Sequence, residues 1–268
     1  MANWSVSDAD PILKQHYTDQ RVLNMVYKNN PLLAIMPKYE NFGGDVLKLP
    51  LIYGDPQNRS ATFSQAASTS TNPATAAFLL TRVSDYSIYN ISNEALLASQ
   101  GNENAFLETL TVAIDGTINA LARSQAIAQY GTGFGNIGTV PTANAGTTLT
   151  LGNANDITNF EVGQVLVFSP SPGANVLSNS GTSLTVVSID RDAGTMVMSA
   201  NVNTAAVSGD YIFVKGDRQD SATPARLKLS GLQAWLPSTA PTSTAFFGVD
   251  RSIDSTRLGG QRKTYTGV

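Results

Sequence analysis

This sequence contains few side chains of the types that carry out catalysis. The chain has one histidine, His16, and no cysteine, which excludes thiol catalysis, thiolate zinc sites and clusters of imidazole ligands. It contains no Gly-x-Ser-x-Gly elbow and no Gly-Lys-Ser or Gly-Lys-Thr triplet, so nothing supports acyl transfer or a P-loop. Carboxylate pairs remain, Asp190 with Asp192 and Asp217 with Asp220, but spacing alone shows no cleft around them. We therefore predict no catalytic residue, no cofactor and no metal site.

One glycine motif matches the dinucleotide-binding fingerprint letter for letter. It runs from Gly133 to Gly138 as Gly-Phe-Gly-Asn-Ile-Gly. In that fingerprint a strand delivers the glycines to the N-terminus of a helix, which holds a pyrophosphate. Here a predicted helix comes before the glycines, and Thr139-Val140-Pro141 follows them. The reversed order favours a flexible connector over a cofactor site.

The composition points toward association. The chain has 268 residues with 17 Lys plus Arg and 20 Asp plus Glu, for a formal net charge of −3. Charged residues make up 14%, whereas a soluble globular domain has about 25%. Because small polar and apolar side chains do little to repel neighbouring molecules, such a surface suits an assembled protein better than a free monomer.

The N-terminal region predicts a helix and no export signal. Asp8 and Asp10 precede Pro11, an acidic start with proline in the first turn, and apolar residues follow as far as Tyr27. His16 lies within this helix, where we expect a polar-face histidine. Acids stand where a secretory signal has basic residues, and no apolar run reaches the length of a membrane span. We expect a protein made in the cytoplasm that does not insert in a membrane.

Strand patterns dominate residues 39–90. Apolar residues favour strands at 46–52, 78–83 and 86–89. The stretch between Ser60 and Thr81 has no charged residue and is rich in Ala, Ser and Thr. Its composition fits either a disordered linker or a long two-stranded arm. Because an isolated hairpin is marginally stable in water, an arm of this kind needs a neighbouring subunit to lie on.

The longest predicted helix follows. A first segment around residues 94–97 is interrupted by Gly101, Asn102 can cap a second segment, and Gly131 ends it. Its apolar residues recur every three or four positions and form a single stripe. These residues are Phe106, Leu110, Ile114, Ile118 and Leu121.

Residues 143–216 predict a self-contained all-β unit. Five short apolar runs separated by turn residues favour a small barrel or sandwich. These runs are 148–151, 165–168, 184–187, 195–198 and 211–214. Between the third and fourth runs, Asp190 to Gly194 resembles part of a calcium loop, but a hairpin turn with a left-handed glycine explains it more simply.

The C-terminal segment is basic. Residues 226–268 contain six Lys and Arg residues and two Asp residues, a local net charge of +4. The six basic residues are Arg226, Lys228, Arg251, Arg257, Arg262 and Lys263. Nucleic acid is one partner for such a segment. Pairing with acids elsewhere in an assembly is the alternative that we favour.

The order of these parts resembles the major capsid protein of tailed double-stranded-DNA phages, whose fold is named after phage Hong Kong 97. An N-terminal helix, an extended arm, a long single-stripe helix, an inserted β unit and a mixed C-terminal segment follow one another in both. Two local stretches are also similar to this family: 159–164, Asn-Phe-Glu-Val-Gly-Gln, and 246–252, Phe-Phe-Gly-Val-Asp-Arg-Ser, with Thr256 to Gly260.

This resemblance implies an α+β phage major capsid fold with an N-arm, an extended loop, a spine helix, and peripheral and axial domains. The implied parts are an N-terminal arm with its helix at 1–40, the extended loop and its strands at 41–91, the spine helix and connector at 92–142, the inserted β domain at 143–216 and a return to the peripheral and axial domains at 217–268. Members of the family commonly continue well beyond the point matching Leu258, so we expect either a truncated or partly represented chain or an axial domain that is built differently.

The resemblance also implies roles for particular residues. Arg59, Phe63, Phe78 and Arg82 fall in the extended loop and would make inter-subunit contacts. The five-residue stripe would form the spine-helix core. Asp250, Arg251 and Arg257 would lie in the axial segment.

The implied function is structural, not enzymatic. The protein would assemble with itself into hexamers and pentamers of an icosahedral shell around double-stranded DNA, contacted without sequence specificity. Its other partners would be a separate scaffolding protein, a portal and a decoration protein, and its place the virion capsid, assembled in the host cytoplasm. A tail or adhesion protein with a glycan-binding β unit is the second interpretation, and a carboxylate-dependent hydrolase the third.

Overall fold

A computed structural model describes residues 30–39, 46–88, 90, 103–141, 144, 146–173, 176–218 and 226–263. The chain divides into two compact units, Met1–Lys38 with Asp85–Ile127, and Tyr39–Ser84 with Ala128–Val268. The structure is a mixture of helices and two antiparallel sheets. The predicted N-terminal helix, with His16, and the first helical segment at 94–97 lie outside the described residues.

The first unit is organised by one long helix. Helix α6 (Glu103–Tyr130) confirms the predicted helix that ends at Gly131, and its last three residues belong to the second unit. The short helix α3 (Pro31–Ile35) begins with proline at its first position, which suits a helix start. Asn30, just before α3, is buried and donates from Nδ2 to Ala122 O at 3.1 Å. Asp85 accepts a hydrogen bond from Ser124 Oγ at 2.5 Å, so α6 is tied to both flanking segments.

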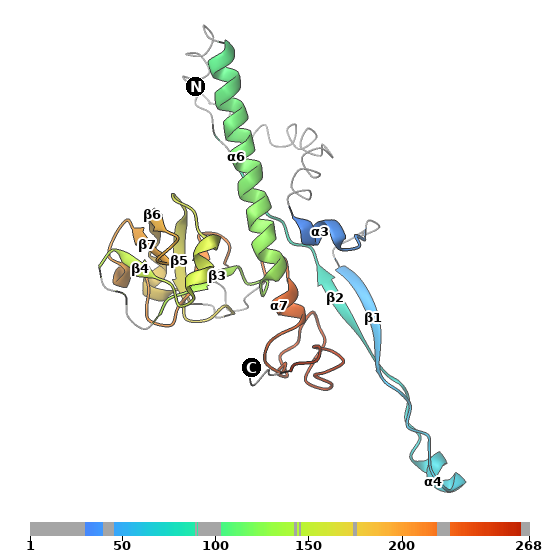
Figure 1. Ribbon diagram of the computed structural model, residues 1–268. Helices are drawn as coiled ribbons and strands as arrows, with labels where there is room; N and C mark the ends of the chain where they lie inside the picture. Colours follow the sequence, from blue (N-terminus) through green and yellow to red (C-terminus); the bar gives the residue numbers. More distant parts are fainter. Residues whose placement is uncertain are drawn as a thin grey trace, which may run out of the picture. The chain divides into compact units, whose positions relative to one another are not determined.

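A long hairpin opens the second unit. Strand β1 (Val46–Gly54) pairs antiparallel with β2 (Ala74–Thr81) in a separate two-stranded sheet, and the short helix α4 (Phe63–Ser68) lies at the tip (Figure 1). The predicted two-stranded arm is confirmed, but the sequence did not predict α4. The strand expected at 86–89 is wrong, because residues 82–88 form no strand.

The β unit is a six-stranded antiparallel sheet with the order β3-β8-β5-β6-β7-β4. The two edges of this sheet are also joined, because Gly152 N, just after β4, donates a hydrogen bond to Thr139 O of β3 at 2.8 Å. The sheet therefore bends toward closure as a barrel. Its strands are β3 (Asn136–Thr139), β4 (Thr148–Thr150), β5 (Val165–Ser169), β6 (Leu184–Asp190), β7 (Thr195–Met198) and β8 (Tyr211–Val214). Three 3-10 helices connect them, η1 (Ala154–Asn159), η2 (Ser178–Gly181) and η3 (Val202–Thr204).

This β unit holds most of the described apolar core. All five predicted strands are present, and their inward side chains are almost completely removed from solvent. Burial of this kind is the main stabilising term available to a chain without disulfides. The largest buried side chains here are Phe160, Phe168, Phe213, Leu149, Leu166, Leu184, Met196, Met198 and Ile212.

The start of the β unit corrects an expectation. The glycine-rich stretch predicted as a flexible connector forms β3, which pairs with β8, so the unit begins near residue 136 and not at 143. Gly138 is needed there, because a Cβ would lie 3.1 Å from the ring of Phe160. Gly135, at φ 86°, lies against Asp217, where a Cβ would be 2.9 Å from the carbonyl oxygen. The chain therefore enters and leaves the unit at one place, as an inserted domain requires. We call residues 136–217 the β module.

The C-terminal segment has little regular structure. Helix α7 (Leu232–Trp235) begins at Gly231, which approaches the end of α6 so closely that a Cβ would lie 2.1 Å from Gln129 O. A turn at 246–249 and a series of turns at 251–259 follow.

Candidate subunit-contact surfaces

The hairpin has one apolar face and one mixed face. Residues paired across the strands share a face, so Leu47 with Leu80, Leu49 with Phe78 and Leu51 with Ala76 form an apolar row. The opposite face carries Val46, Lys48, Pro50 and Ile52 from β1. No residue of either strand is buried, and Ile52 is 70% exposed.

The tip of the hairpin presents an aromatic side chain. Phe63, the first residue of α4, is 90% exposed. Hydrogen bonds between the two sides of the tip nevertheless order it. Gln57 N donates to Thr71 Oγ1 at 2.8 Å, and Thr71 N donates to Asn58 Oδ1 at 3.1 Å. Arg59 is exposed in the same tip. An exposed phenyl ring on a fixed loop is the kind of side chain that anchors protein interfaces.

The base of the hairpin is held by an aromatic cluster from the C-terminal segment. Phe78 on β2 packs edge-on against Trp235, with ring centroids 5.3 Å apart, and Trp235 packs against Phe246 at 5.0 Å. Phe247 stacks on Trp235, and its carbonyl accepts a hydrogen bond from Leu79 N at 2.8 Å. Phe78, which the resemblance assigned to inter-subunit contacts, is thus used inside the chain.

The other strand of the hairpin is held by an arginine. Arg257 donates from Nη1 to the carbonyl of Tyr53 on β1 at 2.7 Å. Its Nε lies 3.5 Å from Asp254 Oδ2, which orients the side chain. Arg257 and Phe247 therefore hold the two strands from the same C-terminal segment. This contact could not be predicted from the residue types, since Tyr53 takes part through its backbone.

Arg251 is the most buried of the C-terminal cations. Its Nη1 donates to the carbonyls of Ala234 and Trp235 at 3.0 and 3.1 Å, at the end of α7, and its Cζ lies 3.9 Å from the centroid of Phe246. Burial lowers the pKa of Arg251, and repulsion by Arg226 and Arg262 lowers it further. Its Nε is buried and has no acceptor among the described residues.

The remaining C-terminal cations also find partners close by. Lys228 pairs with Asp217 at 3.0 Å, and Arg262 donates to the carbonyls of Gly259 and Ser255. Neither nucleic acid nor distant acids are needed to explain these side chains. Backbone carbonyls, aromatic rings and local acids hold most of the basic residues that the sequence left unassigned.

Asp250, the acid of the predicted axial segment, stabilises a turn. Its Oδ1 accepts hydrogen bonds from Ser252 N at 2.8 Å and from Ser252 Oγ at 2.7 Å. These two bonds favour the charged carboxylate and lower the pKa of Asp250.

The predicted stripe on α6 falls only partly within the described side chains. Ile114, Ile118 and Leu121 are half-buried, while the side chains of Phe106 and Leu110 lie outside the described residues. Between residues 114 and 130, only Ala122 and Gln129 are buried. Arg82, beyond the end of β2, is exposed.

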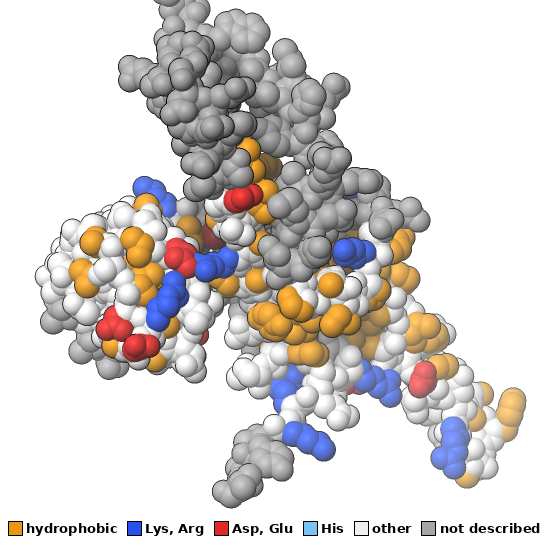
Figure 2. Space-filling model, turned by 45° about the horizontal axis from the view of Figure 1, so that its top comes forward, with side chains coloured by type: hydrophobic (Ala, Val, Ile, Leu, Met, Phe, Trp, Pro, Cys, Tyr) orange, Lys and Arg blue, Asp and Glu red, His pale blue; other side chains and the backbone are white. Residues whose placement is uncertain are grey.

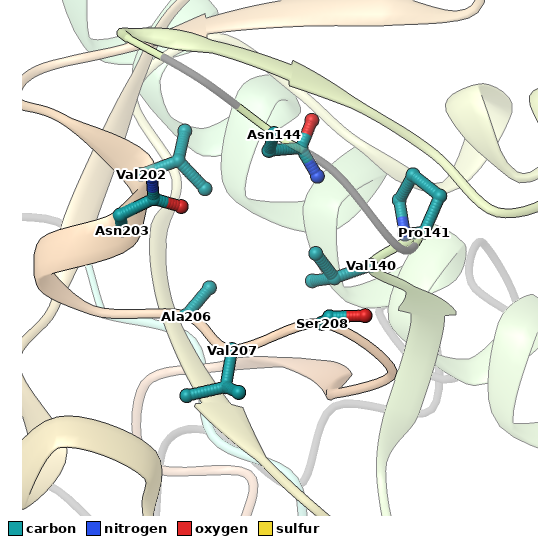
Figure 3. A pocket seen from close by; sticks show the side chains of 8 residues that line it. All are labelled: Val140, Pro141, Asn144, Val202, Asn203, Ala206, Val207 and Ser208. Carbon is teal, nitrogen blue, oxygen red and sulfur yellow. The ribbon is translucent and has the colours of Figure 1, made fainter.

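The β module has a shallow pocket of about 410 Å³. Figure 3 shows its lining, which comes from the segment after β3, from η3 and from the loop after η3. The eight lining side chains are small, none is charged or aromatic, and Asn144 uses its Oδ1 to accept from Thr150 N at 2.8 Å. These residues offer no group for acid–base or nucleophilic chemistry.

The carboxylate pairs take structural positions. Asp190 Oδ1 accepts from the backbone N–H groups of Asp192 and Ala193, and Gly194 has φ 65°, which confirms the predicted hairpin turn. Asp217 pairs with Lys228, and Asp220 lies outside the described residues. Within the described ranges, no group of three or more His, Asp or Glu side chains could hold a metal ion.

Comparison with known proteins gives no match to a family model, to a curated protein or to a solved structure. In the part of the chain that the structure describes, no helix combines the length and apolar character needed to cross a bilayer.

Proposed function

We propose that this chain is the major capsid protein of a tailed double-stranded-DNA phage. It would assemble with itself into pentamers and hexamers of an icosahedral shell, in the host cytoplasm and together with a separate scaffolding protein and a portal. Packaged DNA would be contacted without sequence specificity, and a decoration protein would bind the finished shell.

The observation that carries this proposal is the hairpin. Nine residues of β1 and eight of β2 form an ordered two-stranded sheet in which no side chain is buried. An isolated two-stranded hairpin is marginal in water, and ordering it costs about 1–2 kcal/mol of backbone entropy per residue. The C-terminal segment contacts only part of it, at Tyr53, Phe78 and Leu79. A neighbouring subunit lying on the part of the hairpin beyond these contacts, around Ile52 and Phe63, supplies the missing burial.

The surface supports a protein that associates. Figure 2 shows few charged side chains among broad uncharged and hydrophobic areas. Large apolar side chains are exposed on several segments, including Ile52, Phe63, Tyr86 and Ile88 at 70% or more. Exposed apolar side chains in this number favour protein contacts.

Electron microscopy of the purified chain tests the proposal. Negative staining is expected to show closed shells, or free pentamers and hexamers, when the chain is expressed alone or with its scaffolding protein. Trimers would point to a tail or adhesion protein instead. A small fixed oligomer or a monomer at every concentration would contradict a capsid function.

A further inference from the structure

Arg226 is held in a single orientation by groups on several sides. Its Nε donates to the carbonyl of Thr132 at 3.2 Å. Its Cζ lies 4.5 Å from the ring centroid of Phe134 and 4.8 Å from that of Phe246. A guanidinium stacked on rings and fixed at Nε keeps the orientation of its two terminal nitrogens, so little rotamer entropy is lost when they bind an anion.

The terminal nitrogens of Arg226 are available for such a bond. No described residue accepts a hydrogen bond from them, and they are not among the nitrogens closed off from solvent. The rings and the surrounding backbone remove water from the rest of the guanidinium, and this burial lowers the pKa of Arg226. A partly dehydrated guanidinium with an open edge interacts with a carboxylate more strongly than a fully solvated one does.

Positive charge around Arg226 is not balanced by the described acids. Arg251 contacts the same ring, that of Phe246, and its bonds go to carbonyls. The nearby acids are already engaged: Asp217 with Lys228, Asp254 with Arg257, and Asp250 with Ser252. This side of the C-terminal segment therefore presents an unmatched basic site.

The β module carries the opposite charge. Residues 136–217 contain six acids and two bases, a balance of −4, against +4 for residues 226–263. The exposed turn between β6 and β7 holds Asp190, whose Oδ1 stabilises the turn, and Asp192, whose carboxylate has no partner among the described residues. Asp192 is thus an exposed carboxylate in a part of the chain whose net charge is opposite to that of residues 226–263.

We propose that the guanidinium of Arg226 is the receptor for a carboxylate from a second copy of the chain, and that Asp192 on the β6–β7 turn of that copy supplies it. The contact joins two different surfaces, so it closes a ring when it is repeated head to tail and a dimer when it is made twice about a two-fold axis. This inference rests on the proposed function only in requiring that the chain associates with itself.

Charge exchange in the full-length chain tests the pairing. Arg226→Glu and Asp192→Arg are each expected to weaken self-association at least about tenfold in sedimentation velocity, because each places like charges together. The double variant, Arg226→Glu with Asp192→Arg, restores the opposite charges and is expected to recover most of the loss. Lys263→Glu is the matched control, since it makes the same change of charge at an exposed residue of the same segment, and it is expected to associate like the unmodified chain.

The outcomes separate this inference from the capsid function. If the unmodified chain forms shells and Asp192→Arg forms them equally well, the pairing is wrong and the capsid function stands. Small oligomers that depend on both residues would support the pairing and contradict the capsid. Loss of binding to a DNA duplex in Arg226→Lys, with unchanged self-association of Asp192→Arg, would overturn the pairing in favour of a phosphate receptor. Should Arg226→Glu fail to fold, as judged by circular dichroism, Asp192→Arg alone decides, because this exposed turn residue makes no core contact.

Discussion

The β module and the hairpin are both antiparallel sheets of the same chain, yet they are stabilised in different ways. In the module, side chains such as Phe160, Phe168 and Ile212 have no exposed surface. In the hairpin every side chain is exposed or half-buried, and its contacts to the C-terminal segment lie at a few positions. A sheet that closes around its own core can fold by itself. The side chains of a two-stranded sheet, in contrast, are buried only by contact with other segments or other subunits. The module is therefore expected to be stable alone, and the hairpin to gain stability from assembly.

The largest effect is expected in the module core. Phe168→Ala should lower the free energy of unfolding by about 3–5 kcal/mol, because it removes a completely buried ring and leaves a cavity. The measurement is urea denaturation of residues 136–217 expressed alone. Val187→Ala, at an exposed position of β6, is the control and should change stability by less than about 0.5 kcal/mol. Unfolding of the fragment without a cooperative transition would contradict an independent module.

The same residue type in the hairpin should behave in the opposite way. Phe63→Ala removes a ring that is 90% exposed, so the unfolding of the free subunit should change by less than about 0.5 kcal/mol. Self-association should weaken by about 1–3 kcal/mol if the ring enters a neighbouring subunit. Sedimentation velocity gives the association, and thermal unfolding of dilute protein gives the stability. Unchanged association would remove Phe63 from the interface.

Proteolysis compares the hairpin before and after assembly. Arg59 is the only basic residue between Lys48 and Arg82, so trypsin can cut this segment at one bond. Cleavage there is expected to be at least about tenfold slower in assembled particles than in free subunits, because a covered tip opens less often. Arg59→Gln identifies the product by abolishing it. Equal rates in both states would contradict burial of the tip by a neighbour.

Much of this contrast could be predicted from the sequence. Short apolar runs separated by turn residues located all five expected strands of the module, because a strand in a packed sheet must place apolar side chains in the core. Strand β3 was missed because Gly133 to Gly138 has the composition of a linker, and only the close approach of Phe160 explains why glycine is needed. Helix α4 was missed because Phe-Ser-Gln-Ala-Ala-Ser is short and has no acidic residue in its first turn and no basic residue in its last turn.

The contacts made by the arginines of the C-terminal segment, including the one at the base of the hairpin, could not be predicted from the sequence. Arg251, Arg257 and Arg262 donate to backbone carbonyls, and any residue type provides a carbonyl. The sequence does contain one signal. Three aromatic residues, Trp235, Phe246 and Phe247, lie in the basic segment, and this combination indicates a cation–π cluster. The roles proposed for Arg59 and Phe63 remain predictions.

A smaller effect is expected where the C-terminal segment holds β1. Arg257→Ala removes the hydrogen bond to Tyr53 O and should lower stability by about 0.5–1.5 kcal/mol, since the side chain is largely exposed. The loss should appear locally, as faster hydrogen exchange at the base of the hairpin and unchanged exchange in the module. Arg191→Ala, which loses an exposed ion pair with Glu161 inside the module, is the control and should leave the hairpin amides unchanged. Faster exchange in both regions would show that the two sheets are coupled.

The smallest effect concerns the turn that follows the aromatic cluster. Ser252→Ala removes the hydroxyl that contributes most to the lowered pKa of Asp250, while the backbone N–H remains. A carboxylate whose pKa is lowered in the folded state stabilises the protein above its usual pKa, and this contribution is lost as the pH falls through the lowered value. The variant should therefore be slightly less stable than the unmodified chain at neutral pH and equally stable in acid, in urea denaturation at both pH values. Ser255→Ala, in the same series of turns, should show no such dependence on pH. A difference that persists in acid would show that the Ser252 hydroxyl acts through packing and not through the charge of Asp250.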